Sequence, residues 1–529
     1  MRVNFARRAI LAFAIVNAAL FTALLPLWEG FDEAFHYGYV EDLWQSRKLP
    51  VLARTLVPYD VVASFPLAPV SNISRRAIPE GTAYDAWFAL PAGERERRRL
   101  ALEQLAPDPR PVLRGNYEAH QPPLAYLLLA PVDWSLRKLP LTVRVLVLRL
   151  FCGVGSAVLL FFGASALCRL LEVPESFATA ALFGIFCSEM LYATTAHVAN
   201  DWLAVGASVF LLVELVKLVR APGRRTALAA GAWLTAGLLA KSYFLVFAAF
   251  AVGLAAVLVA RGRTRIATLL PGAALAIVVA GPWYVRNIVL YGNAGGTPEA
   301  FEGVGLRQIL AAAPRVDWPA TAAFLARASL WTGNNTFNTY SRATLNVLLA
   351  GLALAMAAWF WRRRAIRSAE WTVMAASALF LAGVAYEGCA MVANHPGQLV
   401  PGPNPWYTQV LLAPLMALAY LGLSGWKRAG RVLAGAIVTL WAWILVATWM
   451  LKLFPMYASG LSSSMRARDA WNWWTHDTAA HARNLSETAL APAGWLYAAL
   501  ALALALTAAV WGLVMRALAK GELPVAKAQ

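Results

Sequence analysis

The sequence predicts an all-α polytopic membrane protein with about 12 transmembrane helices and amphipathic surface helices in a large first outer loop. Of its 529 residues, 60% are hydrophobic and only 14% are charged, against about 25% charged residues in a soluble globular domain. Apolar runs of about 20 residues, the length that crosses a bilayer as a helix, recur along the chain. This composition excludes disordered, collagen-like and ordinary cytosolic proteins.

The apolar runs locate the individual spans. The first run follows Arg2, Arg7 and Arg8 and lacks a small-residue cleavage site, so we expect a retained anchor rather than a signal peptide. The stretch 226–260 can be one span or two, divided at Lys241. Read as two, it gives spans at 5–28, 144–170, 177–196, 199–219, 226–241, 243–260, 266–284, 343–361, 371–392, 405–425, 431–452 and 493–516.

The net charge of +18 would suggest a nucleic-acid partner in a soluble protein. Here the basic residues lie mostly between the apolar runs, so lipid headgroups and membrane topology account for them, and we expect no nucleic-acid partner. With the N-terminus inside, every inner loop is basic, as the positive-inside rule requires. These loops contain Arg2/Arg7/Arg8, Arg169, Arg220/Arg224/Arg225, Arg261/Arg263/Arg265, Arg362/Arg363/Arg364/Arg367, Lys427/Arg428/Arg431 and Arg516/Lys520.

Three long loops then face outward, at 29–143, about 286–342 and about 455–492. Loops of this length are usually functional or carry their own structure. In the first loop we expect helices around 35–44, at 94–105 and from Pro122 to about Trp134, lying on the outer membrane surface. We divide the chain into an N-terminal catalytic module, 1–342, which includes loop 29–143, and a C-terminal module, 343–529, which includes loop 455–492.

An acidic motif, 28–38, lies where the first span leaves the membrane. Asp32 is placed to cap a helix, and Glu33, His36 and Tyr37 then share one helical face. A carboxylate here can act as a general base for an attacking hydroxyl if its surroundings tune its pKa. The alternative is a helix cap followed by a solvated acidic face, and the spacing alone does not decide between the two.

Two further outward segments carry polar groups. In segment 117–126, His120 and Gln121 can bind a polar headgroup or assist the base, or the segment can simply start an interfacial helix at its proline pair. In turn 197–201, Asp201 can orient a substrate or hold a basic partner, or can be an ordinary turn and cap residue.

Cations and aromatic residues at the outer ends of the spans are candidates for substrate binding. Lys241 can bind a phosphate or extend to lipid headgroups. Arg286, which follows Tyr284 at a span exit, can hold phosphate oxygens or belong to an interfacial belt. Trp406 and Tyr407 can stack on a sugar or form part of the same belt.

Common catalytic motifs are missing. The sequence contains no phosphate-binding Gly-x-x-x-x-Gly-Lys-Ser/Thr loop, no Gly-x-Gly-x-x-Gly, no Cys-x-x-Cys and no His-Glu-x-x-His. The cysteines, all in apolar stretches, are Cys152, Cys168, Cys187 and Cys389. ATP-driven transport, dinucleotide redox chemistry, zinc hydrolysis and a disulfide framework therefore have no signal, and no metal site is predicted.

The order of these motifs resembles a known superfamily. Segment 31–38, with its acidic pair, resembles the opening of the bacterial relatives of protein O-mannosyltransferases and of the lipid A aminoarabinose transferase, which are GT-C glycosyltransferases. Segment 117–126 resembles the aromatic/basic-x-Pro-Pro-Leu-x-Tyr segment of their first loop. The chain departs from the pattern in having an extra residue, Phe35, before His36, and His120-Gln121 where a basic residue often precedes the proline pair.

The resemblance implies a GT-C fold and transfer of a sugar from a polyprenyl-phosphate-linked donor to a hydroxyl acceptor, which is a glycan, a lipid or a protein. It implies that Asp32, with Glu33 beside it, activates the acceptor, while Lys241, Arg286 and Arg114 are our candidates to stabilise the phosphate that leaves. No cofactor is required, and a divalent metal is possible but not indicated. The expected location is the bacterial inner membrane, with the site on the periplasmic side.

Three other functional classes stay open, one of which is a non-catalytic assembly subunit. A lipid-linked oligosaccharide ligase or polymerase would share the same outer-face site. A transporter or flippase of a lipid-linked sugar usually has inverted repeats and charges at mid-membrane. The sequence has no clear repeat, and its polar groups cluster at the outer face, so an enzyme is favoured.

Overall fold

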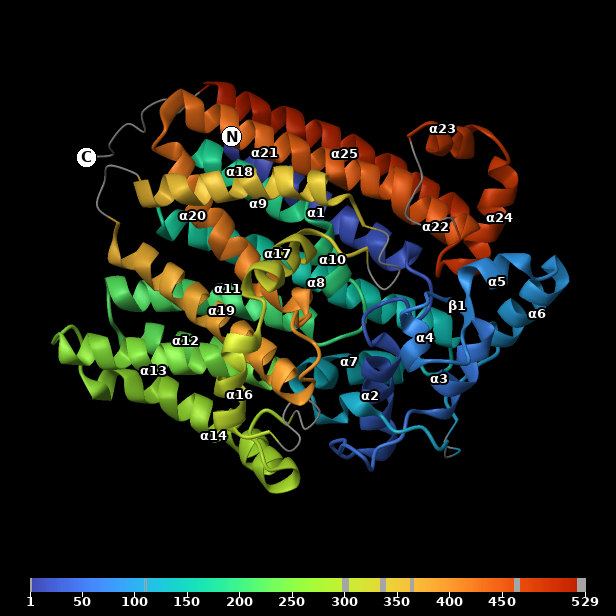
Figure 1. The fold of residues 1–529 in the computed structure, drawn as a ribbon, viewed down its shortest axis with the longest axis horizontal. Coiled ribbons are helices and arrows are strands. Elements are labelled where there is room, and N and C mark those ends of the chain that lie inside the picture. Colours follow the sequence, from blue (N-terminus) through green and yellow to red (C-terminus); the bar gives the residue numbers. More distant parts are fainter. Residues whose placement is uncertain are drawn as a thin grey trace.

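The computed structural model describes residues 2–108, 110, 112–296, 304–333, 339–361, 366–460 and 467–520, and within these it is a bundle of helices. The long helices run side by side, and short elements from the first and third outer loops gather at one end (Figure 1). Arg2, at the start of the first helix, and Lys520, at the end of the last, lie at the opposite end. The described strands are β1 (Pro69–Val70) and β2 (Thr82–Ala83), which pair in parallel with Pro69 opposite Thr82.

The predicted membrane spans are confirmed in large part. Among the described residues, 9 helical segments are long and apolar enough to cross a membrane, or up to 10 if the pair α9 and α10, which is bent by 56°, forms one span. The long helices are α1 (Arg2–Leu24), α8 (Leu141–Leu170), α9 (Glu175–Phe186), α10 (Glu189–Thr195), α11 (Asp201–Arg220), α14 (Ile266–Tyr291), α18 (Arg342–Trp361), α19 (Ser368–Asn394), η5 (Pro405–Leu411) with α20 (Leu412–Ser424), α21 (Lys427–Thr448) with the π-helical turn η6 (Trp449–Leu453) and α22 (Phe454–Ser459), and α25 (Ala493–Lys520).

The stretch around Lys241 forms two helices rather than one. These are α12 (Arg224–Ala240) and α13 (Phe244–Ala260), each of 17 residues, which is close to the shortest length that spans a bilayer. Helix α12 packs very closely on α14: a Cβ added to Gly231 would lie only 2.3 Å from the Gly272 carbonyl oxygen. Small residues at such a contact let membrane helices approach one another.

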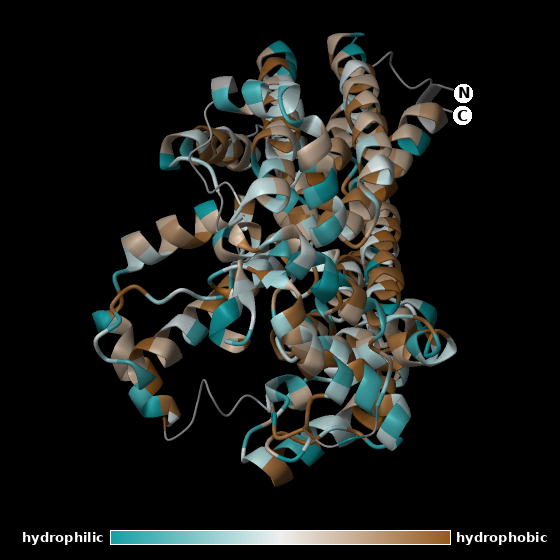
Figure 2. Cartoon of the chain, turned by 90° about the vertical axis from the view of Figure 1, so that its right-hand side faces the viewer, coloured by the Kyte–Doolittle hydropathy of each residue, from teal (hydrophilic) through white to brown (hydrophobic). Residues whose placement is uncertain are grey.

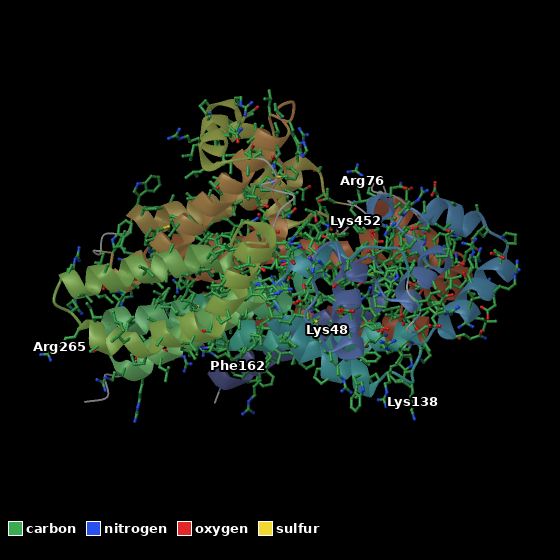
Figure 3. All side chains as sticks on the ribbon, turned by 90° about the horizontal axis from the view of Figure 1, so that it is seen from below. Lys48, Arg76, Lys138, Phe162, Arg265 and Lys452 are labelled. Carbon is green, nitrogen blue, oxygen red and sulfur yellow. The ribbon has the colours of Figure 1, made fainter. Side chains whose placement is uncertain are left out.

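The side of the bundle has the surface of a membrane protein. Phe162, on α8, projects from the middle of the bundle and is 53% exposed, whereas Arg265 lies at one end and Arg76 and Lys138 at the other (Figure 3). Seen from the outer end, the hydrophilic segments lie mostly in the short elements and at the helix ends (Figure 2). The basic residues Arg362, Arg363 and Arg364, used to predict the topology, lie outside the described residues.

The first outer loop contains the predicted helices among several others. The predicted helix 94–105 is α6, and the helix expected from Pro122 is α7. The elements are α2 (Glu33–Ser46), α3 (Tyr59–Ser64), η1 (Phe65–Leu67), α4 (Ser74–Ala77), α5 (Tyr84–Ala89), α6 (Ala92–Glu103), η2 (Tyr117–His120) and α7 (Leu124–Ser135). The other outer loops contain α16 (Leu306–Ala312), η3 (Ala313–Arg315), α17 (Trp318–Leu330), α23 (Ala467–Thr475) and α24 (Thr478–Thr488).

Helix α2 corrects the prediction of a helix on the membrane surface, and it also excludes the alternative of a solvated acidic face. Most of its residues are buried, including Glu41, which is fully buried. The reason is an ion-pair cluster around Arg144, at the start of α8. Its guanidinium contacts Glu41 Oε2 at 2.8 Å, Asp60 Oδ2 at 3.2 Å and Asp133 Oδ2 at 2.6 Å, and all four side chains are fully buried. One cation thus joins α2, α3, α7 and α8.

Candidate functional site

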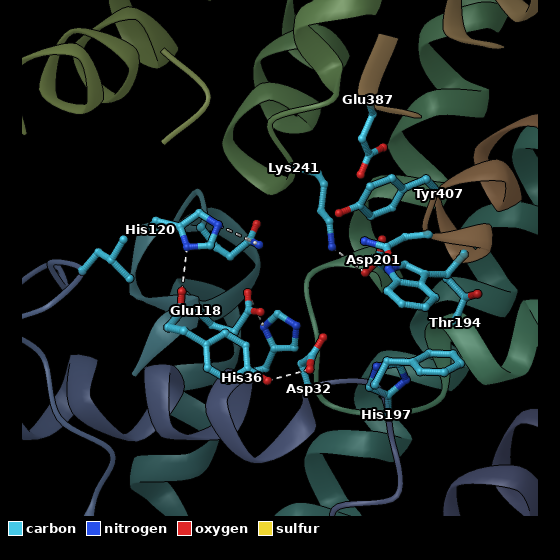
Figure 4. A pocket seen from close by; sticks show the side chains of 16 residues that line it. Asp32, His36, Glu118, His120, Thr194, His197, Asp201, Lys241, Glu387 and Tyr407 are labelled. Atoms are coloured by element: carbon cyan, nitrogen blue, oxygen red, sulfur yellow. Dashed lines mark hydrogen bonds and ion pairs between the residues drawn. The ribbon is translucent and has the colours of Figure 1, made fainter. Parts of the chain in front are cut away.

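A cavity of about 350 Å³ lies where loop 29–143 meets the ends of the long helices (Figure 4). Four separate parts of the sequence supply most of its wall: the start of α2, the η2 segment, the turn between α10 and α11, and the η5 segment. The lining residues are Phe31, Asp32, His36, Leu52, Tyr117, Glu118, His120, Gln121, Thr194, His197, Asp201, Lys241, Glu387, Asn404, Trp406 and Tyr407.

Many of the residues singled out in the sequence meet in this cavity. Those that line it are Asp32, His36, His120, Gln121, Asp201, Lys241, Trp406 and Tyr407, whereas Glu33, Tyr37, Arg114, Tyr284 and Arg286 do not. Figure 4 shows Asp32 and Lys241 reaching toward the same space from opposite sides. A carboxyl group and an ammonium group therefore face one enclosed space.

Asp32 does not cap helix α2, which corrects the prediction from sequence. Its backbone is in the left-handed region, with φ 54° and ψ 18°, and its side chain makes no capping hydrogen bond. Aspartate tolerates this conformation better than most residues. Its carboxylate accepts a hydrogen bond from the Tyr117 hydroxyl at 2.6 Å instead. The side chain is therefore turned from the helix end toward the cavity.

Glu33, the other member of the acidic pair, lies in the protein interior. It forms a bidentate ion pair with Arg149, in which Arg149 Nε lies 2.6 Å from Glu33 Oε1. Both side chains are fully buried. Its Oε1 also accepts the Val198 N–H at 3.0 Å. Burial opposes ionisation, but the charge and hydrogen bonds of Arg149 outweigh it, so the pKa of Glu33 is lowered. Glu33 is therefore a buried, ion-paired residue that does not line the cavity.

Lys241 follows the last residue of α12 and is nearly buried, at 5% exposed. Its Nζ donates to Asn200 Oδ1 and to Asp201 Oδ2, both at 2.7 Å. It also lies 5.5 Å from the ring centroid of Tyr407. The sequence left open whether Lys241 extends to lipid headgroups, and the structure directs it into the cavity. Asp201 holds Lys241 as its basic partner, which is one of the three roles considered for it.

Two histidines on the opposite wall are held in defined orientations. His120 Nδ1 donates to the Tyr117 carbonyl at 2.7 Å, which leaves Nε2 toward Gln121. His36 Nδ1 lies 2.7 Å from the Tyr126 hydroxyl. Burial lowers the pKa of both rings, and the charge of Lys241 lowers both further. Both imidazoles are therefore neutral at neutral pH, with one donor and one acceptor nitrogen each.

Aromatic rings form another part of the wall. Phe31 and Trp406 stack with ring centroids 4.5 Å apart and planes 18° apart. Trp406 in turn meets Tyr407 edge to face at 6.1 Å. Rings fixed in this way present apolar faces and edges to whatever occupies the cavity, next to the polar groups of the other walls.

The predicted residues outside the cavity use their polar groups elsewhere. The Tyr37 hydroxyl donates to Asp133, in the cluster around Arg144, at 3.0 Å. The Arg114 guanidinium donates to the Ala77 carbonyl, and that of Arg286 donates to the Pro50 carbonyl. The Tyr284 hydroxyl donates to the Leu238 carbonyl at 2.8 Å. Of the three predicted phosphate-binding cations, only Lys241 lines the cavity.

The sequence interpretation missed several lining residues. Glu118 and His197 lay inside segments that were recognised, but they were not selected. Glu387 had a clearer signal, because an acidic residue inside an apolar span is costly and is often functional. Asn404 likewise lay in a recognised segment, beside Trp406 and Tyr407, whereas Thr194 carried no distinguishing pattern. Among the described residues, no group of three or more His, Cys, Asp or Glu side chains is arranged to hold a metal ion.

A second, more apolar cavity of about 410 Å³ adjoins the first. The two share Gln121, Lys241, Glu387 and Tyr407 as lining residues. Beyond these, apolar side chains of α13 and α19 dominate its wall, among them Leu245, Val246, Phe380 and Val384. The polar cavity therefore continues, on the Lys241 side, into an apolar groove between membrane helices.

Comparisons with known proteins add a structural likeness. No protein-family model matches the chain, and no curated protein matches its sequence significantly. Among solved structures, it is similar to ArnT from Cupriavidus metallidurans, whose crystal structure contains bound undecaprenyl phosphate. The match covers 98% of this chain and 77% of that chain, with 12% identity and a TM-score of 0.44. At this TM-score the likeness carries no argument about function, and the proposal below rests on the site.

Proposed function

We propose that this protein is a membrane glycosyltransferase of the GT-C type, which moves a sugar from a polyprenyl-phosphate-linked donor to a hydroxyl acceptor. One observation carries the proposal: a polar cavity with a carboxylate, Asp32, facing a cation, Lys241, continues on the cation side into an apolar groove. A lipid-linked sugar phosphate has the matching order of parts, which are a polar ring, an anionic phosphate and an apolar chain.

The cavity's groups suit the chemistry of this transfer. The acceptor hydroxyl attacks the anomeric carbon of the sugar, and Asp32 takes the proton of that hydroxyl. The bond between the anomeric carbon and the phosphate oxygen breaks, and polyprenyl phosphate leaves with the electron pair. Lys241 stabilises the charge that develops on this phosphate. Because Tyr117 donates to Oδ1 of Asp32, Oδ2 is the oxygen that we assign to the acceptor.

The resting contacts of Lys241 also suit a phosphate site. Its ammonium group has three donors, of which Asn200 and Asp201 take two. The remaining N–H is available to a phosphate oxygen, and the position of Lys241 between the two cavities puts that oxygen at the junction of sugar and lipid chain. The leaving group is a phosphate monoester of a lipid, so in this proposal no metal is obligatory.

We place the reaction at the outer face of a bacterial inner membrane. The support is the orientation of the chain: the basic inner loops follow the positive-inside rule, and loop 29–143 then faces outward with the cavity beneath it. The acceptor would reach the site from the periplasm, and membrane lipids would surround the donor's chain. The acceptor itself is a glycan, a lipid or a protein.

The test is transfer of label in a lipid bilayer. The purified protein is reconstituted in lipid and incubated with radiolabelled polyprenyl-phosphate-mannose and an extract of outer membrane and periplasm, and the donors carrying glucose, galactose and aminoarabinose are then tried in turn. We expect label to move from the lipid to another molecule with the native protein. Asp32→Asn should abolish transfer, whereas Asp85→Asn, at an exposed position of α5 outside the cavity, should retain it.

Three outcomes would contradict the proposal or a part of it. Full transfer by the Asp32→Asn variant would refute the base assignment. Movement of intact labelled lipid across the bilayer, with no covalent transfer from any donor, would instead identify a transporter or flippase. Transfer of preassembled oligosaccharides but of no single sugar would identify a ligase or polymerase.

A further inference from the structure

Hydrogen bonds hold the turn between α10 and α11 in place close to His197. On one side, the Val198 N–H donates to Glu33, which is itself held by Arg149. On the other side, Asn200 donates to Gln121 Oε1 at 3.0 Å and to the Ala240 carbonyl at 2.9 Å. The backbone that carries His197 is therefore fixed by buried polar contacts.

The ring of His197 is fixed as well, by packing. A Cβ on Gly30 would lie 2.6 Å from His197 Cβ and 2.7 and 2.8 Å from the ring carbons Cγ and Cδ2, so the side chain lies directly against the Gly30 backbone. Phe31 meets it edge to face, with centroids 6.0 Å apart. Both contacts come from residues that directly precede Asp32, so His197 and Asp32 belong to the same end of the cavity (Figure 4).

The ring nitrogens of His197, by contrast, are not hydrogen-bonded to any described residue. The residue is 2% exposed, and neither Nδ1 nor Nε2 has a hydrogen-bond partner among the described residues. Buried side-chain nitrogens are rarely left without partners, because they lose their hydrogen bonds to water on burial. A fixed, buried imidazole that lines a cavity and lacks hydrogen-bond partners among the described residues indicates a ligand-binding group.

The protonation state of His197 limits the kind of ligand. Burial lowers its pKa, although the charges of Glu33 and Asp201 partly oppose this. A neutral imidazole offers one donor and one acceptor nitrogen. A sugar hydroxyl can satisfy either nitrogen, whereas a fully ionised phosphate can only accept. The phosphate is also assigned to the other end of the cavity, at Lys241.

We propose that His197 is a specificity-determining residue that hydrogen-bonds a hydroxyl of the donor sugar next to Asp32. This inference rests on the proposed function, since it concerns the sugar of the same donor. It assigns the sugar ring to the end formed by Asp32, Phe31 and His197, and it explains why the acidic pair is divided: Asp32 faces the sugar, whereas Glu33 holds the turn that carries His197.

The test compares binding of lipids with and without a sugar. Polyprenyl-phosphate-mannose and polyprenyl phosphate are titrated, in separate experiments, against the protein in lipid nanodiscs. For the native protein we expect tighter binding of the mannose-bearing lipid. In His197→Phe this preference should fall by about 5- to 10-fold, the value of one hydrogen bond, while the affinity for polyprenyl phosphate stays unchanged. His197→Gln, which keeps a donor and an acceptor, should retain part of the preference.

His481 provides a matched control. It is another histidine that contacts an aromatic ring, because it stacks on Trp473 at 4.3 Å. Its Nδ1 also lacks a hydrogen-bond partner among the described residues, but it lies outside the cavity. His481→Phe should leave both affinities unchanged. Donors that each lack one hydroxyl complete the test. One of these donors should bind the native protein more weakly than the complete donor does. His197→Phe should bind that same donor and the complete donor equally well.

Each alternative outcome has a distinct meaning. If His197→Phe keeps the full preference for the sugar-bearing lipid, the inference is wrong and the proposed function stands. If the affinities for both lipids fall together, His197 has only a structural role. If the native protein binds no mannose-, glucose-, galactose- or aminoarabinose-bearing lipid better than polyprenyl phosphate, the proposed function fails and the inference fails with it.

Discussion

Replacing Glu33 by glutamine removes the negative charge from a fully buried ion pair while keeping the shape of the side chain. Arg149 would then lose its anionic partner in the interior, and its acceptors would be the amide oxygen of the glutamine and the carbonyl groups of Thr22, Leu25 and Pro26. Breaking one side of a buried pair costs about 3–5 kcal/mol. Because these carbonyls still serve Arg149, we expect the lower end of this range, about 3 kcal/mol.

The measurement is thermal unfolding in detergent at a fixed scan rate. For domains of 150–250 residues, 1 kcal/mol moves the midpoint by about 2–4 °C, and the shift shrinks as size increases. For a chain of this length we expect about 3–6 °C for Glu33→Gln. The pKa of Glu33 is lowered in the folded protein, so this stabilisation is present above the ordinary glutamate pKa and disappears as the pH falls through the lowered value.

A matched variant separates the pair from a general effect of losing a glutamate. Glu214 pairs with Lys217, whose side chain is 45% exposed, so Glu214→Gln should cost less than about 1 kcal/mol. Adding Arg149→Met to Glu33→Gln should recover part of the loss, since the uncompensated charge is then gone. Equal midpoints for the two single glutamine variants would refute the reasoning.

Three further predictions concern the first loop and the cavity. Burial raises the pKa of Glu29 to about 8. The folded protein should therefore lose stability as the pH rises from about 4.5 to 8, by up to about 1.4 kcal/mol per pH unit. Glu29→Gln should remove this loss, which thermal unfolding between about pH 5 and 9 would measure. Lys241→Gln should weaken binding of polyprenyl phosphate about tenfold in nanodiscs, since the site loses its cation. Gly30→Ala should cost about 1–3 kcal/mol in thermal unfolding, because its Cβ meets the His197 ring, and should reduce the preference for the sugar-bearing lipid.

Each of these predictions has an opposing result. A Glu29→Gln variant with the same pH dependence as the native protein would show that Glu29 ionises normally. Unchanged polyprenyl-phosphate affinity in Lys241→Gln would remove Lys241 from the phosphate site. Native stability and native lipid preference in Gly30→Ala would mean that the His197 ring can move away without consequence.

Much of the fold follows from the sequence, because apolar length is a local property. The long spans and the positions of α6 and α7 could all be predicted from composition and spacing. The surface position expected for α2 was wrong, since Glu41 pairs with Arg144, which is 103 residues away in the chain. Local periodicity carries no information on a partner that distant. The proposed division at residues 342 and 343 stays a prediction.

The candidate site could be predicted in part, for a similar reason. Asp32, Asp201 and Lys241 lie at outer ends of helices, and a common topology brings such ends together. The cap assigned to Asp32 failed because Tyr117, far along the loop, takes its carboxylate instead. Arg114 and Arg286 are as outward and as basic as Lys241, but nearby carbonyl groups bind them. Only the folded chain distinguishes these cations.

The cluster around Arg144 has a consequence for biogenesis. During synthesis, Glu41, Asp60 and Asp133 leave the ribosome before Arg144, and their burial without a cation would be costly. Burial raises the pKa of Glu41 and of Asp60 even in the finished protein. The outer loop therefore cannot reach its final packing until the second span has been made and inserted. Loop 29–143 can then complete its packing only after α8 has been inserted. A nascent chain that ends before residue 144 should therefore expose α2 to proteases.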